Sequence, residues 1–381
     1  MKSTTLFLAA LAVLSAVVTG KVANDDVGYF WHFSDTHIYP QYKEGSDPLV
    51  GLCRTLTGKT GKYGNYNCDA PAILVNSAVD QIVRQSGGNA PDFVLYGGDH
   101  ICIFDTTQSK EMSIENIHNI TEYLRRIKRA LPNTKIFPAL GNHDVVPQFQ
   151  MPETGPFYVY STISKEWAEF LSEESAKTLN HSAYYTELIA PGLRLVALNT
   201  ILYYQENLLV SREIEDPAGQ FEWMHGVLDS ARKNGERVLL TAHVPPGKDF
   251  WAEFNERYLK AFTGYNDVLV GAFYGHTHQE KFRVVKDVTE EAEAAHISFI
   301  TSSVSPKYNI NPSVTLYKYK KTYPFTILDR IPYYMSKKKY ITFLYDFIFI
   351  FIFPIYEITN FSCLLVYLFL YFFYFYRRQR Y

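Results

Sequence analysis

The amino-acid sequence predicts an α/β fold, and three observations support this class. Short apolar runs typical of buried strands alternate along the chain with capped or amphipathic helical segments. Hydrophobic residues make up 47% of the 381 residues and charged residues 20%, which permits a large core and excludes a globally disordered chain. Several of the apolar runs end in polar side chains, and the ends of strands are where α/β proteins usually bind their ligands.

The expected strands are short apolar runs that end at glycine or polar residues. They lie at residues 29–33, 93–96, 135–140, 193–198, 237–241 and 268–274, followed by shorter segments at 281–286, 296–302 and 314–320.

The helices are predicted from their periodicity and their end signals. Asp69 is the expected N-cap of a helix over residues 70–85, and Gly87-Gly88 would stop it. The segment 218–233 is amphipathic and closes on Gly235. Further helices are expected at 114–130 and 165–179.

Residues 1–20 have the pattern of a signal peptide. Met1-Lys2 precedes an apolar run over residues 6–18, and small residues follow up to Gly20. The alternative, an uncleaved signal anchor, is disfavoured because the apolar run is too short to span a bilayer. Cleavage would place the remaining chain in a secreted, lysosomal or extracellular setting, where the sequons at Asn119 and Asn180 could carry glycans.

The four cysteines fit an oxidising compartment better than a zinc knuckle, because none of them has CxxC spacing. Cys53 and Cys68 flank a loop just before a helix start and are expected to form a disulfide, whereas Cys102 and Cys363 have no assigned partner. With 37 Lys and Arg against 39 Asp and Glu, the net charge of −2 argues against binding to a nucleic-acid polymer. A monomer is expected.

Five of the expected strands end in side chains that commonly bind metals. Imidazole and carboxylate groups suit zinc, iron or manganese, and a carboxylate can bridge two ions. Two ions held close together are a recurrent device for phosphate-ester hydrolysis. Seven groups at these strand ends fit two metal ions with one shared aspartate: Asp35, His37, Asp99, Asn142, His243, His276 and His278.

The order D-x-H, GD, GNH, H and GHxH resembles that of calcineurin-like metallophosphoesterases. Within that superfamily, residues 28–336 are most similar to acid sphingomyelinase-like phosphodiesterases, with matching segments at 31–37, 141–144, 198–200, 243–247 and 274–278. The resemblance implies a four-layer α/β/β/α sandwich with mixed sheets over residues 21–337. It also implies two zinc sites that share Asp99, one completed by Asp35, His37 and His278 and the other by Asn142, His243 and His276. His143 would be the general acid.

Three departures from the resemblance affect the expected activity. Only residues 21–27 separate the signal peptide from the first motif, so we expect no saposin-like domain and no action on sphingomyelin in a bilayer. The second active-site histidine of the family falls at Ile103, and two interpretations of His100, a substitute or a packed loop histidine, remain open. Cys102 stands where purple acid phosphatases have an iron-binding tyrosine, which argues against a purple iron site.

Residues 338–381 form an aromatic, hydrophobic tail unlike the rest of the chain. Residues 341–376 contain no Lys or Arg, and Arg377-Arg378 follow them. A membrane anchor, a buried core element and the translation of a retained intron or wrong gene boundary are the three interpretations.

The sequence therefore predicts a secreted two-zinc phosphodiesterase that hydrolyses a phosphodiester or nucleotide phosphate by attack of a metal-bridging hydroxide. A phosphomonoesterase and a non-catalytic surface-binding protein are the alternatives.

Overall fold

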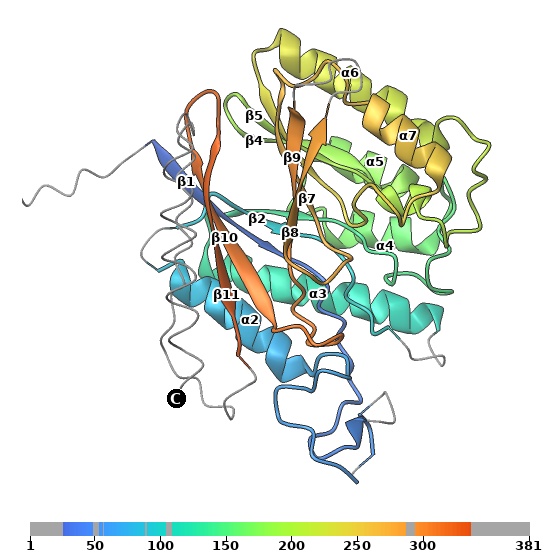
Figure 1. Cartoon of the computed structure of the whole chain (residues 1–381), viewed down its shortest axis with the longest axis vertical. Coiled ribbons are helices and arrows are strands. Elements are labelled where there is room, and N and C mark those ends of the chain that lie inside the picture. The colour runs from blue at the N-terminus through green and yellow to red at the C-terminus, as the bar shows by residue number, and fades with distance from the viewer. Residues whose placement is uncertain are drawn as a thin grey trace, which may run out of the picture. The chain divides into compact units, whose positions relative to one another are not determined.

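Two mixed β-sheets form the centre of the fold in the computed structural model (Figure 1). The structure describes residues 26–336 except 49–52, 56, 88–89, 104–108 and 287–293. The predicted signal peptide, Cys363 and the tail at 338–381 lie outside the described residues.

The first sheet has the strand order β11-β10-β1-β2-β3. Its strands β1, β2 and β3 run parallel to one another, β10 pairs antiparallel with β1, and β11 pairs antiparallel with β10. Their bounds are β1 Val27–Phe33, β2 Phe93–Tyr96, β3 Lys135–Pro138, β10 Ser313–Lys320 and β11 Ile327–Tyr334.

The second sheet has the strand order β4-β5-β6-β7-β9-β8, with four central parallel strands and antiparallel β4 and β8 at its edges. The bounds are β4 Tyr185–Ala190, β5 Leu193–Ala197, β6 Arg237–Thr241, β7 Leu269–Tyr274, β8 Lys281–Lys286 and β9 Ala294–Ile300. Because parallel strands end at the same edge of a sheet, the loops after β1, β2 and β3 meet, as do those after β6 and β7.

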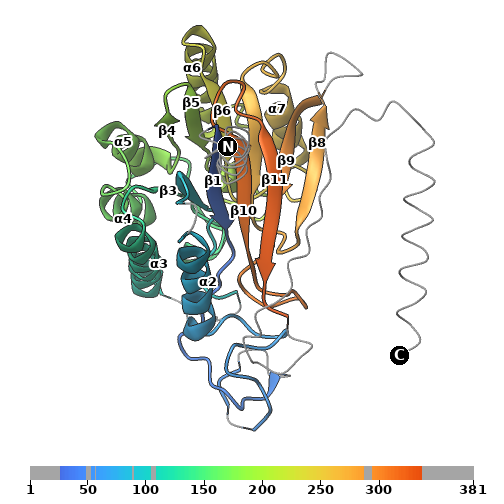
Figure 2. The ribbon, with the colours of Figure 1, turned by 90° about the vertical axis from the view of Figure 1, so that its left-hand side faces the viewer.

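Helices cover the outer face of each sheet. Helices α2 (Ala72–Gln85) and α3 (Lys110–Ala130) lie next to each other (Figure 2) and share an apolar cluster with the first sheet. Helices α6 (Gln220–Lys233) and α7 (Ala252–Lys260) pack on the second sheet. Side chains from both sheets form a third cluster with α4 (Tyr158–Glu166) and α5 (Glu173–Ser182), in which Phe30 stacks on Phe93 with ring centroids 4.4 Å apart. The predicted four-layer α/β/β/α arrangement is therefore confirmed.

Several predicted helix boundaries were wrong, because one expected cap is used by a residue distant in sequence and two local serine caps were overlooked. Helix α2 begins after Pro71. The carboxylate of Asp69 accepts a hydrogen bond from the backbone N–H of Ile103 instead of capping the helix. Helix α3 begins earlier than expected because Ser109 caps it by accepting a hydrogen bond from Met112. The expected helix at 165–179 is split into α4 and α5, since Ser172 starts a second helix.

Two strands and one α-helix of the described residues were not predicted from the sequence, β4, β11 and α7, nor were the short 3-10 helices η2 (Thr200–Tyr203) and η3 (Pro217–Gly219). Strand β4 lies at a sheet edge, and only two of its six residues, Tyr185 and Ile189, are buried. Strand β11 is half-exposed and carries Pro332, which weakens its strand signal. Helix α7 has only two fully buried residues, Phe254 and Tyr258, so its apolar face is narrow.

The predicted disulfide between Cys53 and Cys68 is present, and Cys102 is a buried free cysteine. Of the two predicted glycosylation sites, Asn180 is exposed on α5, whereas Asn119 is half-buried on α3. Among the described residues, no helix has both the length and the apolar character needed to cross a membrane.

Removing a buried histidine should weaken the acid sensitivity of the fold. His296 is 6% exposed on β9, and within the described part of the chain neither ring nitrogen has a hydrogen-bond partner. Burial lowers its pKa from 6.5 to about 4, so its neutral form stabilises the fold above pH 6.5 and this stability is lost as the pH falls. The free energy of unfolding falls between pH 7 and pH 5, and His296 contributes about 2 kcal/mol of that fall. In His296→Phe the fall should therefore be smaller by this amount.

Urea unfolding at both pH values measures this difference, and the exposed His181 provides a matched histidine-to-phenylalanine control. An unchanged pH dependence in His296→Phe would show that His296 accepts a proton without cost in the folded state.

Candidate active site

Loops that follow five strands meet at one edge of the fold and bring the predicted ligands together. The loops are tied by backbone hydrogen bonds, from Asp35 N to Gly98 O at 2.9 Å and from Gly275 N to His243 O at 3.0 Å. The candidate ligands at the ends of β1, β2 and β7 lie in the left-handed backbone region, which non-glycine residues seldom adopt: Asp35 (φ 52°), His37 (37°), Asp99 (59°), His276 (68°) and His278 (58°). Backbone strain of this kind concentrates at functional sites.

One group of side chains comprises Asp35, His37 and His278, whose ligand atoms lie within 4.8 Å of one another. The Nε2 atoms of His37 and His278 are 3.0 Å apart, and His278 Nε2 lies 3.5 Å from Asp35 Oδ1. The Nδ1–H of His37 donates to the backbone carbonyl of Ile101 at 2.7 Å. This bond turns Nε2 of His37 toward the group, as in many metal-binding histidines.

The second group comprises Asp99, His243 and His276, again within 4.8 Å. His243 donates from Nδ1 to the carbonyl of Gly97 at 2.7 Å, which turns its Nε2 toward Asp99. Asn142 joins this group because its Oδ1 lies 2.9 Å from His276 Nδ1.

Asp99 lies between the two groups. Its Oδ2 is 3.0 Å from Nε2 of His243 and 3.6 Å from Nε2 of His37, so one carboxylate oxygen faces a histidine of each group. The structure thus brings all seven predicted ligands together and places the predicted shared residue between them.

The side chains fit cations at both positions. Two imidazole nitrogens directed at each other, as in His37 and His278, can both be satisfied by one metal ion. Nε2 of His243 approaches Asp99 to 3.0 Å, but among the described residues it forms no hydrogen bond of acceptable geometry. A buried nitrogen and carboxylate in this arrangement suit a shared cation.

The protonation states of these side chains also favour cation binding at both positions. Burial lowers the pKa of His276 to about 3 and that of His278 to about 4, so both rings are neutral and can donate a lone pair to a metal. Burial opposes ionisation of Asp35, but the neighbouring imidazoles of His37, His278 and His243 outweigh it and lower the pKa of Asp35 to about 2. Burial likewise disfavours a charged His243, yet Asp99 raises the pKa of this imidazole to about 9, and a bound cation would replace that proton.

His143 lies beside the candidate ligands. Its backbone N–H donates to Asp99 Oδ1 at 2.8 Å, and its ring lies 5.1 Å from the ring of His37. Burial lowers the pKa of His143 to about 4, against the opposing charge of Asp99.

His100 is not brought to this cluster. Its Nδ1 lies 2.7 Å from Oγ1 of Thr36, and its buried ring packs 6.1 Å from that of Tyr123 on α3. Burial lowers the pKa of His100 to about 3. This environment favours the packed loop histidine over a substitute for the second active-site histidine.

Asp144 has a role at the site that sequence reasoning missed. Its carboxylate accepts backbone N–H groups from two loops: Asp99 at 2.9 Å, Gly141 at 2.8 Å, His100 at 2.6 Å and Ile101 at 3.3 Å. The position of Asp144 in the G-N-H-D segment was the available signal. The contacts that define its role come from a loop more than forty residues away.

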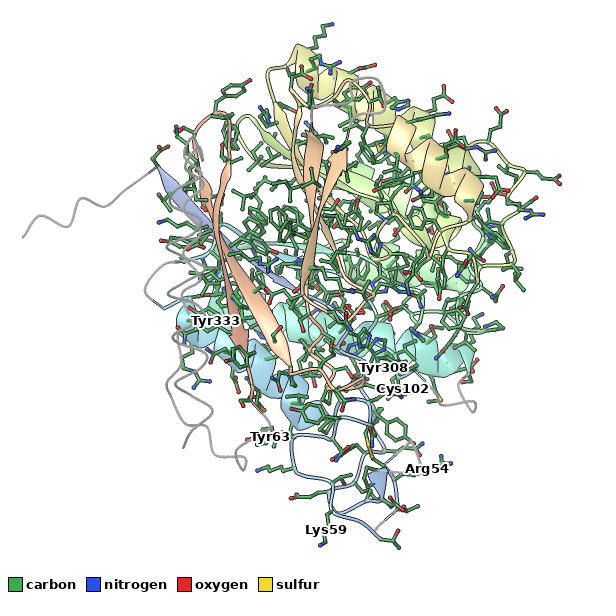
Figure 3. All side chains as sticks on the ribbon, in the orientation of Figure 1. Arg54, Lys59, Tyr63, Cys102, Tyr308 and Tyr333 are labelled. Atoms are coloured by element: carbon green, nitrogen blue, oxygen red, sulfur yellow. A yellow bond between two sulfur atoms is a disulfide. The ribbon has the colours of Figure 1, made fainter. Side chains whose placement is uncertain are left out.

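Aromatic side chains border the cluster. Tyr204 places its ring 5.3 Å from that of His276, whereas Tyr203 is fully buried and stacks on Phe221. Tyr308, labelled in Figure 3, lies 5.3 Å from the ring of His278 and is 53% exposed. Tyr308 was not predicted from the sequence, because nothing local relates it to the histidine motif.

The glycine at position 141 is required by the close approach of two loops. A Cβ atom there would overlap both Oδ1 and the backbone N of Asp99. Gly141→Ala should therefore displace Asp99 and lower kcat for phosphodiester hydrolysis by about 10- to 100-fold, as loss of supporting contacts at metal sites does.

Gly226→Ala is the matched control, because an added Cβ in the described structure meets nothing within 4 Å at that position on α6. Steady-state kinetics of both variants measure this difference in kcat. Full activity in Gly141→Ala would mean that Asp99 does not need its observed position.

Comparisons with known proteins place this site in a family. A family model described as calcineurin-like phosphoesterase matches residues 28–280. Sphingomyelinase phosphodiesterase C of Dictyostelium discoideum is 35% identical over 327 residues, which cover 79% of this chain and 72% of that protein. Cyclic GMP-AMP phosphodiesterase SMPDL3A of Mus musculus is 34% identical over 333 residues, with 81% and 72% covered.

Acid sphingomyelinase-like phosphodiesterase 3b of Homo sapiens is 33% identical over 340 residues, with 82% of this chain and 72% of that protein covered. Both the family match and these identities agree with the resemblance seen in the strand-end motifs. The chain therefore belongs to the calcineurin-like phosphoesterase family, whose members are metal-dependent hydrolases with a dimetal centre, and it is a phosphodiesterase of the acid sphingomyelinase-like group.

Proposed function

We propose that the chain is a secreted two-zinc enzyme that hydrolyses small phosphodiesters or nucleotide phosphates. The observation that carries the proposal is the position of Asp99, whose carboxylate lies between two groups of buried metal-binding side chains. Such an arrangement suits two ions that share one ligand.

The proposed metal is zinc, which suits this donor set. Asp35, His37, Asp99 and His278 would hold one ion, and Asp99, Asn142, His243 and His276 would hold the other. Imidazole nitrogens together with carboxylate oxygens are typical zinc ligands. Two bound zinc ions would supply a hydroxide nucleophile near neutral pH and neutralise charge on the phosphate.

His143 would hold and deliver the proton that the leaving oxygen requires. The amide of this residue is fixed on Asp99 Oδ1, so the imidazole is held beside the candidate ligands. Because burial lowers its pKa to about 4, its protonated form is favoured by an acidic compartment and by the negative charge of a bound phosphate.

A small substrate fits both the relatives and the composition. The names of the mouse and slime mould relatives refer to cyclic GMP-AMP and to sphingomyelinase, and both describe phosphodiesterases. The net charge of −2 gives this chain no electrostatic attraction for a polyanion. We therefore propose a small phosphodiester or nucleotide as substrate and a monomer as the active form.

Secretion is supported by the N-terminal pattern and by the disulfide between Cys53 and Cys68. Glycosylation would be easiest at the exposed Asn180. Association with a membrane through residues 338–381 stays a prediction.

The test is hydrolysis of bis(4-nitrophenyl) phosphate and of the monoester 4-nitrophenyl phosphate by the secreted chain, with zinc and with a chelator. Faster, chelator-sensitive cleavage of the diester is expected. Preference for the monoester would favour a phosphomonoesterase, and a zinc-loaded but inactive chain would favour a binding protein.

A further inference from the structure

We infer that Gln148 is a positioning residue that fixes the tautomer and the orientation of the His143 imidazole. The inference rests on the proposed function, in which His143 delivers a proton to the leaving oxygen. It adds a residue outside the metal-ligand set to that step.

Two of the hydrogen bonds of the Gln148 side chain set its orientation. Its Nε2 donates to the backbone carbonyl of Cys102 at 2.9 Å, and its Oε1 lies 2.8 Å from Nδ1 of His143. A backbone carbonyl can only accept, so the amide nitrogen of Gln148 must face Cys102. The amide oxygen must therefore face His143.

This orientation determines which ring nitrogen of His143 carries a hydrogen. An amide oxygen can only accept, so Nδ1 of His143 must be the donor. In the neutral ring, Nε2 then holds the lone pair, and it is the atom that gains and releases the catalytic proton. Without Gln148 the two tautomers would compete, and the ring could rotate away from the substrate.

The chain around Gln148 holds it in place from both sides. Phe149 N–H donates to the carbonyl of Asn142 at 2.8 Å, and Phe149 has a left-handed φ of 72°. Its ring then packs edge-on against His143 with centroids 4.9 Å apart. On the other side, the loop that carries Cys102 is fixed by Asp69, which accepts the N–H of Ile103 at 2.9 Å.

The effect should depend on how much the leaving group needs a proton. Phenolate is a more basic leaving group than 4-nitrophenolate, so its departure depends more on general-acid catalysis. Gln148→Met retains the length of the side chain and removes both hydrogen bonds. We expect it to lower kcat about 10- to 100-fold for diphenyl phosphate but less than about threefold for bis(4-nitrophenyl) phosphate.

Two further variants serve as comparisons in the kinetic experiment. Gln148→Glu keeps an oxygen that faces Nδ1 and should restore most of the rate for diphenyl phosphate. Gln150→Met is the matched control. The amide of Gln150, in the same loop, also makes two hydrogen bonds, but not to His143: it donates to Glu206 O at 2.7 Å and accepts from Leu208 N at 3.0 Å. This variant should not change the ratio of the two rates.

His143→Ala separates failure of the inference from failure of the proposed function. If His143→Ala lowers both rates equally, His143 is not the acid and the proposed function is wrong at that step. A second outcome overturns only the inference about Gln148. In it, His143→Ala lowers the rate for diphenyl phosphate more than that for bis(4-nitrophenyl) phosphate, whereas Gln148→Met lowers both rates equally or changes neither.

A spectroscopic measurement keeps the inference testable even if Gln148→Met does not fold. In the wild-type protein, ¹⁵N chemical shifts of the His143 ring, assigned by comparison with His143→Ala, should show hydrogen on Nδ1 at neutral pH. Hydrogen on Nε2 with a bare Nδ1 would contradict the inference directly.

Discussion

Replacing Asp99 by asparagine is expected to lower kcat for phosphodiester hydrolysis by at least about 10²- to 10³-fold, the range seen when one preorganised electrostatic group is removed. The variant should also bind less metal. Asp99 Oδ2 faces His37 on one side and His243 on the other, so a neutral amide there weakens both candidate metal positions at once. Steady-state kinetics and metal analysis of the purified variant measure the two effects.

Asp229→Asn is the matched control for this experiment. Asp229 is an exposed carboxylate on α6 that accepts a hydrogen bond from Tyr265 at 2.7 Å, far in sequence from any candidate ligand. It should keep full activity and metal content. An Asp99→Asn enzyme with nearly normal kcat would contradict the assignment of Asp99 as the shared ligand.

Replacing Asp144 by alanine is expected to lower the free energy of unfolding by about 3–5 kcal/mol, because four backbone N–H groups lose their acceptor and each buried donor left unsatisfied costs about 1–3 kcal/mol. The residue is 3% exposed, and its carboxylate accepts hydrogen bonds from all four of these N–H groups. Because two of these groups belong to Asp99 and Gly141, activity should fall together with stability.

Asp144→Asn provides the graded comparison, since one amide oxygen can still accept some of these bonds. Urea unfolding should rank the wild type above Asp144→Asn and Asp144→Asn above Asp144→Ala. Equal stability of all three proteins would show that the loops after β2 and β3 are held together by other contacts.

The candidate ligands could be predicted from sequence because each follows an apolar strand within a few residues. The sequence around Asp35, Asp99 and His243 thus contains both the strand and the ligand, and parallel pairing brings the strand ends together. The same local signals predicted the α/β class and most of the central strands.

The contacts that support the site could not be predicted in this way. Gln148 and Asp144 act through groups on the loop after β2, and their partners depend on how two loops fold against each other. For the same reason Asp69 resembled a helix cap, although its carboxylate is used by Ile103 and by Lys307, whose Nζ lies 3.5 Å away. Tertiary contacts outweigh local propensity at these positions.

His100 illustrates a further limit of sequence reasoning. Its place directly after Asp99 suggested a catalytic histidine, but the left-handed backbone at Asp99 (φ 59°) turns the chain there, and the two side chains have different surroundings. Asp99 faces the candidate ligands while His100 turns toward Thr36 and α3.

The most direct test of the account is a zinc titration of the metal-free chain, with bound zinc and phosphodiester hydrolysis measured on the same samples. We expect that two zinc ions bind per chain, that full activity requires both, and that Asp99→Asn binds fewer ions. Full activity with a single bound ion, or with none, would contradict the two-metal site around Asp99.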